Sequence, residues 1–327
     1  MADVAKLAGV SKMTVSKVIR NVGSVSDDTR ARVREAIEMA GYVPNRIAGS
    51  LSTNINPMVA VVVPTLSGNT FGEALRGIEA VLSVAGLQTF VGATGYDAGS
   101  EERLIENLLS WQPSGLILTS GIAHSEKTRK LLTAQRCPIV EIWDSDATLF
   151  DAKVGVSHRQ AGTLIAEHLL TRGRRDFGYV GSRLSKDLCA AARLAGFRDR
   201  LAQEGVPLEA ILFDDGPRGV EDGITGTERL LAQRPTVDAV YYINDMMAVG
   251  GLTHLHRNQI PVPSQIAIAG FNGTVQNILI TQELTTCVVP GWELGEAAAK
   301  TLLQLMNGDT SENKTVFELK LIHGTTT

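Results

Sequence analysis

The feature that most constrains the fold is a regular alternation, from Met58 onward, of short apolar runs with longer amphipathic segments. Short β-branched runs that alternate with amphipathic helices predict a doubly wound α/β architecture with parallel sheets. The apolar runs lie at 59–64, 115–119, 139–142, 177–181, 239–244 and 266–270, and two of the expected helices lie at 70–86 and 159–173. About 270 residues are too many for one such domain, so we expect two similar subdomains with a cleft between them.

Three short helices are expected before residue 44. Gly9 ends the first helix, Ser11 is placed as the N-cap of the second, Ser26 caps the third, and Gly41 ends it. Their expected apolar faces are Val4, Ala5, Leu7 and Ala8 in the first, Val15, Val18 and Ile19 in the second, and Val33, Ala36, Ile37 and Ala40 in the third. Two short helices joined by a glycine turn and braced by a third predict a helix-turn-helix unit.

The second of these helices is expected to present its polar face to solvent. If its apolar stripe faces inward, Met13, Ser16, Lys17 and Arg20 face outward, and Lys12 lies in the exposed first turn. Such a helix is available for contact with another molecule, although solvated surface lysines would show the same pattern.

The charge of the chain is unevenly distributed. Residues 1–56 hold eight Lys and Arg against five Asp and Glu, whereas the remaining residues hold 23 against 30. A basic head on an acidic body is typical of a nucleic-acid-binding module joined to another domain, although random variation of surface charge would also produce it.

Cysteine usage and hydropathy exclude several classes of protein. Cys137, Cys189 and Cys287 are odd in number and lack C-x-x-C spacing, so neither a disulfide framework nor a metal site is expected, and no cofactor is implied. No apolar run reaches the roughly 18 residues of a membrane span, and no signal peptide precedes Asp3. We therefore expect a cytoplasmic protein with reduced thiols.

Several motifs resemble those of the lactose/galactose repressor (LacI/GalR) family of bacterial transcription regulators, and the similarity covers essentially the whole chain. They are DVAKLAGVSKMTVSKVI at 3–19, VS at 25–26, GYVPNRIAGSL at 41–51, RLAGF at 193–197, IND at 243–245 and AIAGFNG at 267–273. Within the family, SKMTVSK together with GFNG is most similar to repressors of gluconate utilisation. The resemblance implies a helix-turn-helix domain over 1–44, a hinge helix and linker over 45–57, and a periplasmic-binding-protein-like effector and dimerisation domain of two α/β subdomains over 58–327.

The resemblance also implies roles in DNA binding. Lys12, Met13 and Lys17 match base-reading positions, where lysine can donate to guanine and Met13 can contact a thymine methyl group. Ser16 and Arg20 are expected to contact phosphates. Position 17 is more often arginine in the family, which puts bidentate reading of guanine there in doubt. The chain also begins closer to the first helix than in relatives, so either the first helix is poorly capped or the start codon lies upstream.

The segment after the third helix is open to two interpretations from composition alone, a short helix or a plain linker. In the family, the segment that matches Asn45–Leu51 is a hinge helix that folds only on operator DNA. The residue matching Leu51 wedges into the central base step from the minor groove and kinks the duplex, which lets two heads bind. We therefore expect Asn45, Arg46 and Leu51 to contact DNA.

The cleft is expected beyond the carboxyl ends of the strands, where ligands of open α/β sheets bind. The resemblance implies that Arg193, Asn244 and Asn272 hydrogen-bond an effector and that Phe71 packs on it. Further residues at the strand ends complete the predicted site, namely Asn69, Lys186 and Arg218 as candidate ligand contacts, with Ser67, Thr70, Thr119, Trp143, Asp144, Asp187 and Asp245 nearby.

Two departures from the family pattern bear on the ligand. The position of Asn272 is commonly aspartate in sugar-binding relatives, and the segment 214–223 offers Arg218 where relatives often have an aromatic ring. One carboxylate fewer and more cations favour a sugar acid, since charge-assisted bonds to a carboxylate are strong. Arg218 and Lys186 as merely exposed loop charges remain the alternative.

The predicted function is a DNA-binding repressor of carbohydrate catabolism, controlled by a sugar or sugar acid. An enzyme using His158 and Asp144 is disfavoured because no nucleophile elbow, Walker A or dinucleotide motif occurs. A stand-alone sugar-binding or transport protein has no use for residues 1–51, and a neutral or phosphorylated sugar remains an alternative effector. Two half-sites require at least a dimer, and no leucine heptad tail follows, so a homodimer on near-palindromic operator DNA is expected.

Overall fold

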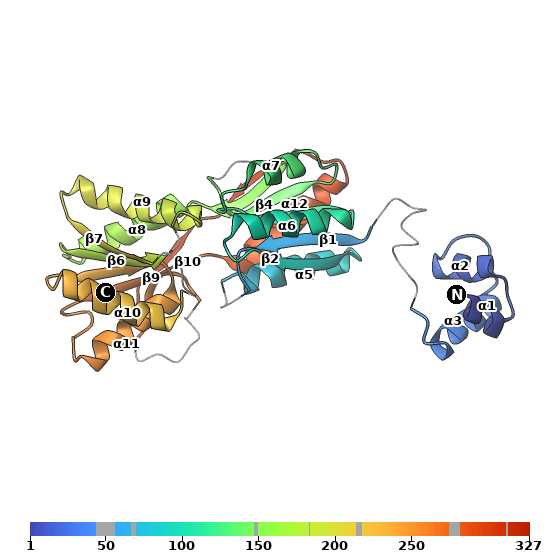
Figure 1. Ribbon diagram of the computed structural model, residues 1–327, viewed down its shortest axis with the longest axis horizontal. Coiled ribbons are helices and arrows are strands. Elements are labelled where there is room, and N and C mark those ends of the chain that lie inside the picture. Colours follow the sequence, from blue (N-terminus) through green and yellow to red (C-terminus); the bar gives the residue numbers. More distant parts are fainter. Residues whose placement is uncertain are drawn as a thin grey trace. The chain divides into compact units, whose positions relative to one another are not determined.

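The computed structural model describes residues 1–43, 56–66, 70–146, 150–182, 184–213, 218–274, 282–311 and 313–327. These residues belong to two compact units, Met1–Asn56 and Pro57–Thr327, which are described separately below (Figure 1). The predicted hinge residues Asn45, Arg46 and Leu51 lie outside the described residues, so the hinge helix stays a prediction.

The first unit contains the three expected helices, α1 (Ala2–Ala8), α2 (Lys12–Ile19) and α3 (Asp27–Met39). Gly9 follows α1 in the left-handed conformation, with φ 63°. The Ser11 hydroxyl accepts a hydrogen bond from the Thr14 amide at 3.1 Å, and the Ser26 hydroxyl accepts one from the Thr29 amide at 3.4 Å. Each cap satisfies an amide that the first turn leaves without a partner, so both predicted caps are confirmed.

A small core holds the three helices together. Its buried members are Val4, Ala5, Ala8, Val15, Val18, Val33 and Ala36, with Val10, Ile19, Val25, Ile37 and Tyr42 packed against them. The prediction that Leu7 and Ala40 face this core is wrong, because the Leu7 side chain is 55% exposed and Ala40, the C-cap of α3, is exposed as well. At about 100° per residue, Val4, Ala5 and Ala8 cluster on one side of α1, and Leu7 points well away from their mean direction.

The turn between α2 and α3 is held by one arginine. Arg30 donates from Nη1 to the side-chain oxygen of Asn21 at 2.8 Å, and from Nη2 and Nε to the carbonyls of Gly23 and Val25, both at 3.3 Å. Asn21 itself has φ 52°. Arg30 therefore braces the loop that follows the exposed helix α2.

The second unit contains two six-stranded sheets, each with helices on both faces (Figure 1). The first sheet has the order β11-β5-β4-β3-β1-β2, and all its neighbours are parallel. Its strands are β1 (Met58–Val63), β2 (Gln88–Ala93), β3 (Gly115–Thr119), β4 (Ile139–Asp144), β5 (Ala152–Val156) and β11 (Lys314–Val316). With its helices α5 (Gly72–Val84), α6 (Ala98–Ser110), α7 (Glu126–Thr133) and α12 (Gly291–Met306) it forms what we call the first lobe.

The second sheet has the order β12-β10-β9-β8-β6-β7, with only β12 antiparallel to its neighbour in the described residues. Its strands are β6 (Phe177–Ser182), β7 (Leu208–Phe213), β8 (Ala239–Tyr242), β9 (Ala267–Asn272), β10 (Thr285–Val288) and β12 (Lys320–Ile322). The helices α8 (His158–Thr171), α9 (Leu188–Gln203), α10 (Val220–Gln233) and α11 (Asp245–Arg257) complete the second lobe. The prediction of two doubly wound subdomains is confirmed.

The chain crosses between the two lobes more than once. Helix α12 follows β10 of the second lobe but packs on α5 of the first, and β12 then returns to the second sheet. Helices α8 and α9 of the second lobe approach so closely that a Cβ on Gly162 would lie 1.9 Å from the Arg193 carbonyl oxygen. This contact fixes the position of α9, which carries Arg193.

No helix in the described part of the chain is long and apolar enough to cross a membrane.

Candidate functional site

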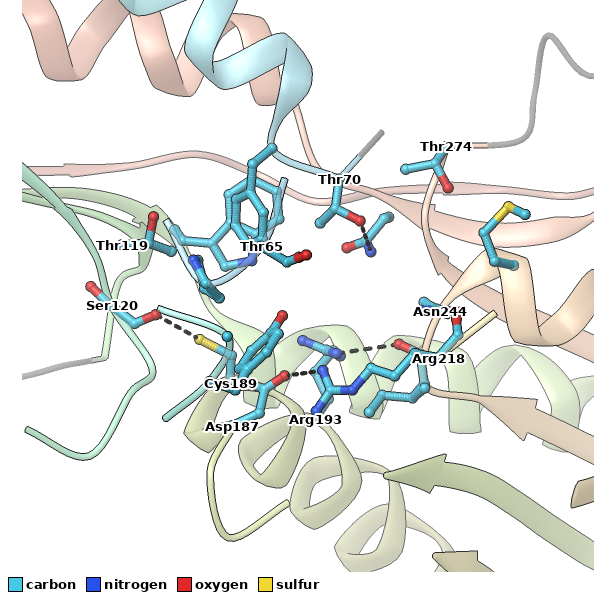
Figure 2. A pocket seen from close by; sticks show the side chains of 18 of the residues that line it. Thr65, Thr70, Thr119, Ser120, Asp187, Cys189, Arg193, Arg218, Asn244 and Thr274 are labelled. Carbon is cyan, nitrogen blue, oxygen red and sulfur yellow. Dashed lines mark hydrogen bonds and ion pairs between the residues drawn. The ribbon is translucent and has the colours of Figure 1, made fainter. Parts of the chain in front are cut away.

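A cavity of about 400 Å³ lies between the two lobes, at the carboxyl ends of β1, β3, β4, β8 and β9 (Figure 2). This is the position at which open parallel sheets bind ligands. The first lobe contributes Pro64, Thr65, Thr70, Phe71, Gly95, Tyr96, Thr119, Ser120 and Trp143, and the second contributes Asp187, Cys189, Arg193, Arg218, Gly219, Ile243, Asn244, Met246, Asn272 and Thr274.

Arg193 is a buried cation on this surface. Its side chain is only 5% exposed, and its guanidinium carbon lies 3.9 Å from the centre of the Phe271 ring. Nη2 donates to the Ile243 carbonyl at 3.3 Å, whereas Nε has no hydrogen-bond partner among the described residues. Nor does Arg193 form an ion pair with any carboxylate in the described ranges. A buried charge in this state is costly unless an anion compensates it.

His158 is a neutral ring that accepts a hydrogen bond from Arg193. Its Nδ1 lies 3.0 Å from Arg193 Nη1, and it must accept that hydrogen bond because a guanidinium has only donors. Burial lowers the pKa of His158 well below its usual value, and the neighbouring Arg193 charge lowers it further. His158 therefore adds no second positive charge beside Arg193.

Arg218 is held by the protein itself. Nη1 forms an ion pair of 2.6 Å with Asp187, Nε donates to the Ser182 hydroxyl at 3.1 Å, and Nη2 donates to the Ser182 carbonyl at 2.9 Å. The face of the guanidinium lies 4.4 Å from the centre of the Tyr96 ring, which belongs to the first lobe. Arg218 lines the cavity as predicted, but its charge is compensated by Asp187.

Two amides extend the polar wall of the cavity. Asn244 caps α11 through its side-chain oxygen, which accepts from the Met247 amide at 2.9 Å, and its NH₂ group donates to the Arg218 carbonyl at 3.1 Å. Asn272 donates to the Thr70 hydroxyl at 3.4 Å, a contact between the lobes. Asn272 has φ 104°, a strained conformation of the kind that gathers at binding sites.

A buried aspartate joins the segments that carry these amides. The Asp245 carboxylate accepts from the Thr274 amide at 2.6 Å and from the Thr286 hydroxyl at 2.6 Å. Burial raises the pKa of Asp245 to about 6, although these hydrogen bonds oppose the shift. The carboxylate thus ties the start of α11 to the residues that follow Asn272.

Two rings form an apolar wall opposite the polar groups. The ring centres of Phe71 and Trp143 lie 4.6 Å apart at an interplanar angle of 50°. Both side chains are buried, and Trp143 has φ 93°. Apolar walls with a few fixed polar groups are typical of small-molecule sites.

Most of the predicted ligand contacts come together here, but not all. Phe71, Arg193, Arg218, Asn244 and Asn272 line the cavity, whereas Lys186 is exposed and does not. Asn69 and Ser67 lie outside the described residues.

The sequence placed Asp187 near the cleft but did not reveal its ion pair with Arg218, and it missed Tyr96 and Cys189. Tyr96 follows β2, a strand that the apolar pattern did not reveal. Asp187 is the N-cap of α9, and its position between a strand and a helix was the available signal.

The exposed face of α2 is a second candidate site. Lys12 and Arg20 are exposed, Met13 is 70% exposed, and Ser16 and Lys17 are partly buried. Met13 is a large apolar side chain that α2 leaves open to solvent beside two lysines. This arrangement suits a surface that contacts DNA bases and phosphates.

Comparisons with known proteins match both parts of the chain. Residues 1–45 match the bacterial regulatory proteins of the lacI family, and residues 166–327 match the periplasmic binding protein-like domain. The HTH-type transcriptional regulator GntR of Pseudomonas aeruginosa is 38% identical, over 94% of this chain and 89% of that protein. A transcriptional regulator from Silicibacter pomeroyi is 41% identical, with a TM-score of 0.94 over 99% of this chain and 98% of that one. The lac repressor dimer bound to operator and the anti-inducer ONPF is 25% identical, with a TM-score of 0.83 over 99% of this chain and 97% of that one.

A helix-turn-helix head followed by a two-lobed domain with a cavity between parallel sheets defines a DNA-binding transcriptional regulator. The relatives just named are regulators of this kind and not enzymes. The chain belongs to the LacI family, which confirms the resemblance of its sequence motifs.

Proposed function

We propose that this regulator acts in the cytoplasm as a repressor of carbohydrate catabolism genes, and that a small sugar acid of the gluconate type controls its affinity for operator DNA. The observation that carries the ligand class is Arg193, a buried cation without an ion pair among the described residues. A ligand carboxylate would compensate this charge through charge-assisted hydrogen bonds.

The rest of the cavity suits a hydroxylated carbon chain. The hydroxyls of Thr119 and Ser120 are buried and have no hydrogen-bond partner in the described parts of the chain. The amide of Asn272 offers a donor and an acceptor without adding a negative charge beside a carboxylate. Phe71 and Trp143 can pack against the C–H face of such a ligand.

On the DNA side, two heads of a homodimer bind two half-sites of a near-palindromic operator. Lys12 and Lys17 donate to guanine, Met13 packs against a thymine methyl group, and Ser16 and Arg20 hold phosphates. Leu51, with Asn45 and Arg46, acts at the centre of the operator. These DNA roles rest on the exposed face of α2 and on the sequence motifs of the family.

Ligand control follows from the contacts that already join the lobes. The Leu188 amide donates to the Gly121 carbonyl at 2.7 Å, Asn272 bonds Thr70, and Tyr96 covers Arg218. A ligand that bridges both walls would favour one arrangement of the lobes over another, and its differential affinity sets the size of the switch.

Calorimetric titration with gluconate and glucose tests the ligand class, with Arg193→Gln and Arg198→Gln compared with the parent. Arg198 lies on the same helix but is exposed, so Arg198→Gln is the matched control. Arg193→Gln is expected to weaken gluconate binding about 30-fold or more, since removing one partner of a buried charge pair costs about 2–5 kcal/mol. Glucose should lose much less.

Fluorescence anisotropy with operator DNA, with and without gluconate, tests the coupling. Gluconate should change the operator affinity of the parent protein. No gluconate binding by the parent, or binding without any effect on operator affinity, contradicts the proposal.

A further inference from the structure

The cavity holds two buried arginines, but they differ in how their charges are balanced. Arg193 has no carboxylate partner among the described residues, whereas Arg218 is paired with Asp187 at 2.6 Å. Arg218, Asp187 and Arg193 all line the same cavity, and all three are nearly inaccessible to solvent (Figure 2). Within the described lining, one positive charge is therefore left to meet a ligand.

The Asp187–Arg218 pair cannot open cheaply toward a ligand. Each nitrogen of the Arg218 guanidinium already donates to Ser182 or Asp187, and Tyr96 covers one face. Asp187 is held as well, because its other oxygen accepts from the Ala190 amide at 2.9 Å and caps α9. The pair thus presents a fixed neutral group to the ligand rather than a free cation.

We infer that Asp187 determines the charge of the ligand: by neutralising Arg218 it selects compounds with a single negative charge and rejects those with two. This inference rests on the proposed function, since it concerns the ligand of the same cavity. A second carboxylate or phosphate near Arg218 would also lie near the Asp187 carboxylate. It would gain no uncompensated cation there and would lose its hydration.

Asp187→Asn tests the inference and keeps the side-chain cap of α9. Asparagine is as good an N-cap as aspartate, so the side-chain oxygen can still accept from Ala190. The NH₂ group would then face Arg218 Nη1, and since both are donors, Arg218 would be released toward the cavity while Ser182 still holds its other two nitrogens. The matched control is Asp97→Asn, which changes the exposed aspartate that caps α6 in the same manner.

The probes are gluconate and glucarate, which differ only in that glucarate carries a second carboxylate at the far end of the chain, together with neutral glucose. Calorimetry should show that the parent and the Asp97→Asn control both prefer gluconate over glucarate. In Asp187→Asn the ratio of glucarate affinity to gluconate affinity should rise at least tenfold, and glucose binding should change by no more than a few fold. The double variant Asp187→Asn/Arg218→Gln removes both charges and should restore the parental preference.

A second single variant, Arg218→Gln, removes the cation of the Asp187–Arg218 pair instead of the carboxylate. Arg218→Gln leaves Asp187 unpaired, so gluconate should bind at least tenfold more weakly while glucose changes by no more than a few fold. An unchanged glucarate-to-gluconate ratio in Asp187→Asn, or equal losses for gluconate and glucose in Arg218→Gln, overturns the inference and leaves the proposed function standing. If the parent binds none of the three probes, the proposed ligand class fails and this inference fails with it.

Discussion

Gly121 should be the residue whose substitution most directly disturbs the contact between the lobes. It follows β3 with φ 94°, a conformation that favours glycine, and its carbonyl accepts from the Leu188 amide of the other lobe at 2.7 Å. A Cβ added here would lie 2.3 Å from Cys189 Sγ and 3.3 Å from both the Cys189 Cβ and its amide nitrogen. Gly121→Ala therefore meets both backbone strain and a steric overlap.

The two costs are similar in size but have separate causes. Alanine held at positive φ costs about 1–3 kcal/mol. The overlap with sulfur is well below van der Waals contact, so α9 and the loop after β3 must move apart, and overpacking of this kind costs about 1–3 kcal/mol. Because α9 and the loop after β3 both border the cavity, we expect gluconate affinity to fall by roughly tenfold to a hundredfold.

A double-mutant cycle with Cys189→Ala checks this reasoning. Cys189→Ala removes the sulfur and leaves a nearest contact of 3.3 Å, which small shifts relieve, but it leaves φ at position 121 unchanged. Calorimetric titration of the parent, both single variants and the double variant should show a coupling of about 1–2 kcal/mol in favour of the double variant. Thermal unfolding of the four proteins identifies any loss caused by partial unfolding.

Two results would refute the reasoning on Gly121. If Gly121→Ala binds gluconate as tightly as the parent, the lobe contact does not contribute to ligand binding. If the two substitutions are additive, the sulfur is not the obstacle.

Three further predictions concern DNA bending, ligand charge and pH. Leu51→Ala should reduce operator affinity and bending with little change in effector affinity, and unaltered bending in a circular-permutation gel assay would return the segment to a plain linker. Asn272→Asp places a second negative charge beside the ligand and should weaken gluconate binding tenfold or more, with a much smaller effect on glucose; equal losses in calorimetry would contradict this. Glu141 is 3% exposed, and burial raises its pKa from 4.5 to about 7, so its folded form binds the proton more tightly and stability falls as pH rises from 4.5 through 7. Glu141→Gln can still accept a hydrogen bond from the Phe150 amide. Its free energy of unfolding should exceed that of the parent by up to about 3 kcal/mol at pH 8, but should not exceed it near pH 4.5. Parallel stability profiles of the two proteins in urea would exclude burial of the Glu141 carboxylate as the cause.

The strands that the sequence revealed are buried on both faces, but β5 is buried throughout as well and was missed, because Lys153 and Gly155 interrupt its apolar run. Every residue of β1, β3, β4 and β6 is buried, so these strands appear as continuous apolar runs. Strands β2 and β7 lie at the sheet edges and are half exposed, and their residues alternate irregularly with polar ones. An edge strand needs no continuous apolar run, which is why the pattern missed both.

In the candidate site, too, the sequence revealed some features and missed others. The positions of Phe71, Arg193 and Asn272 followed from strand ends and from the family motifs, and all three line the cavity. The sequence also offered Lys186 and Arg218 as equivalent cations, but the structure exposes Lys186 and pairs Arg218 with Asp187. Nothing in the local pattern distinguishes these two residues.

What the sequence determined by itself depends on neighbours along the chain. The caps at Ser11 and Ser26 act over three residues, the turn at Gly9 over one, and the buried strands over five or six. Such signals are local because helix and strand periodicity arise from adjacent residues. The tertiary structure alone decided which polar groups meet: Arg218 and Asp187 are 31 residues apart, and Asn272 and Thr70 are 202 apart. Since the cost of a buried charge depends on its partner in space, the cavity's charge is decided only when the second lobe has folded and brought Asp187 to Arg218.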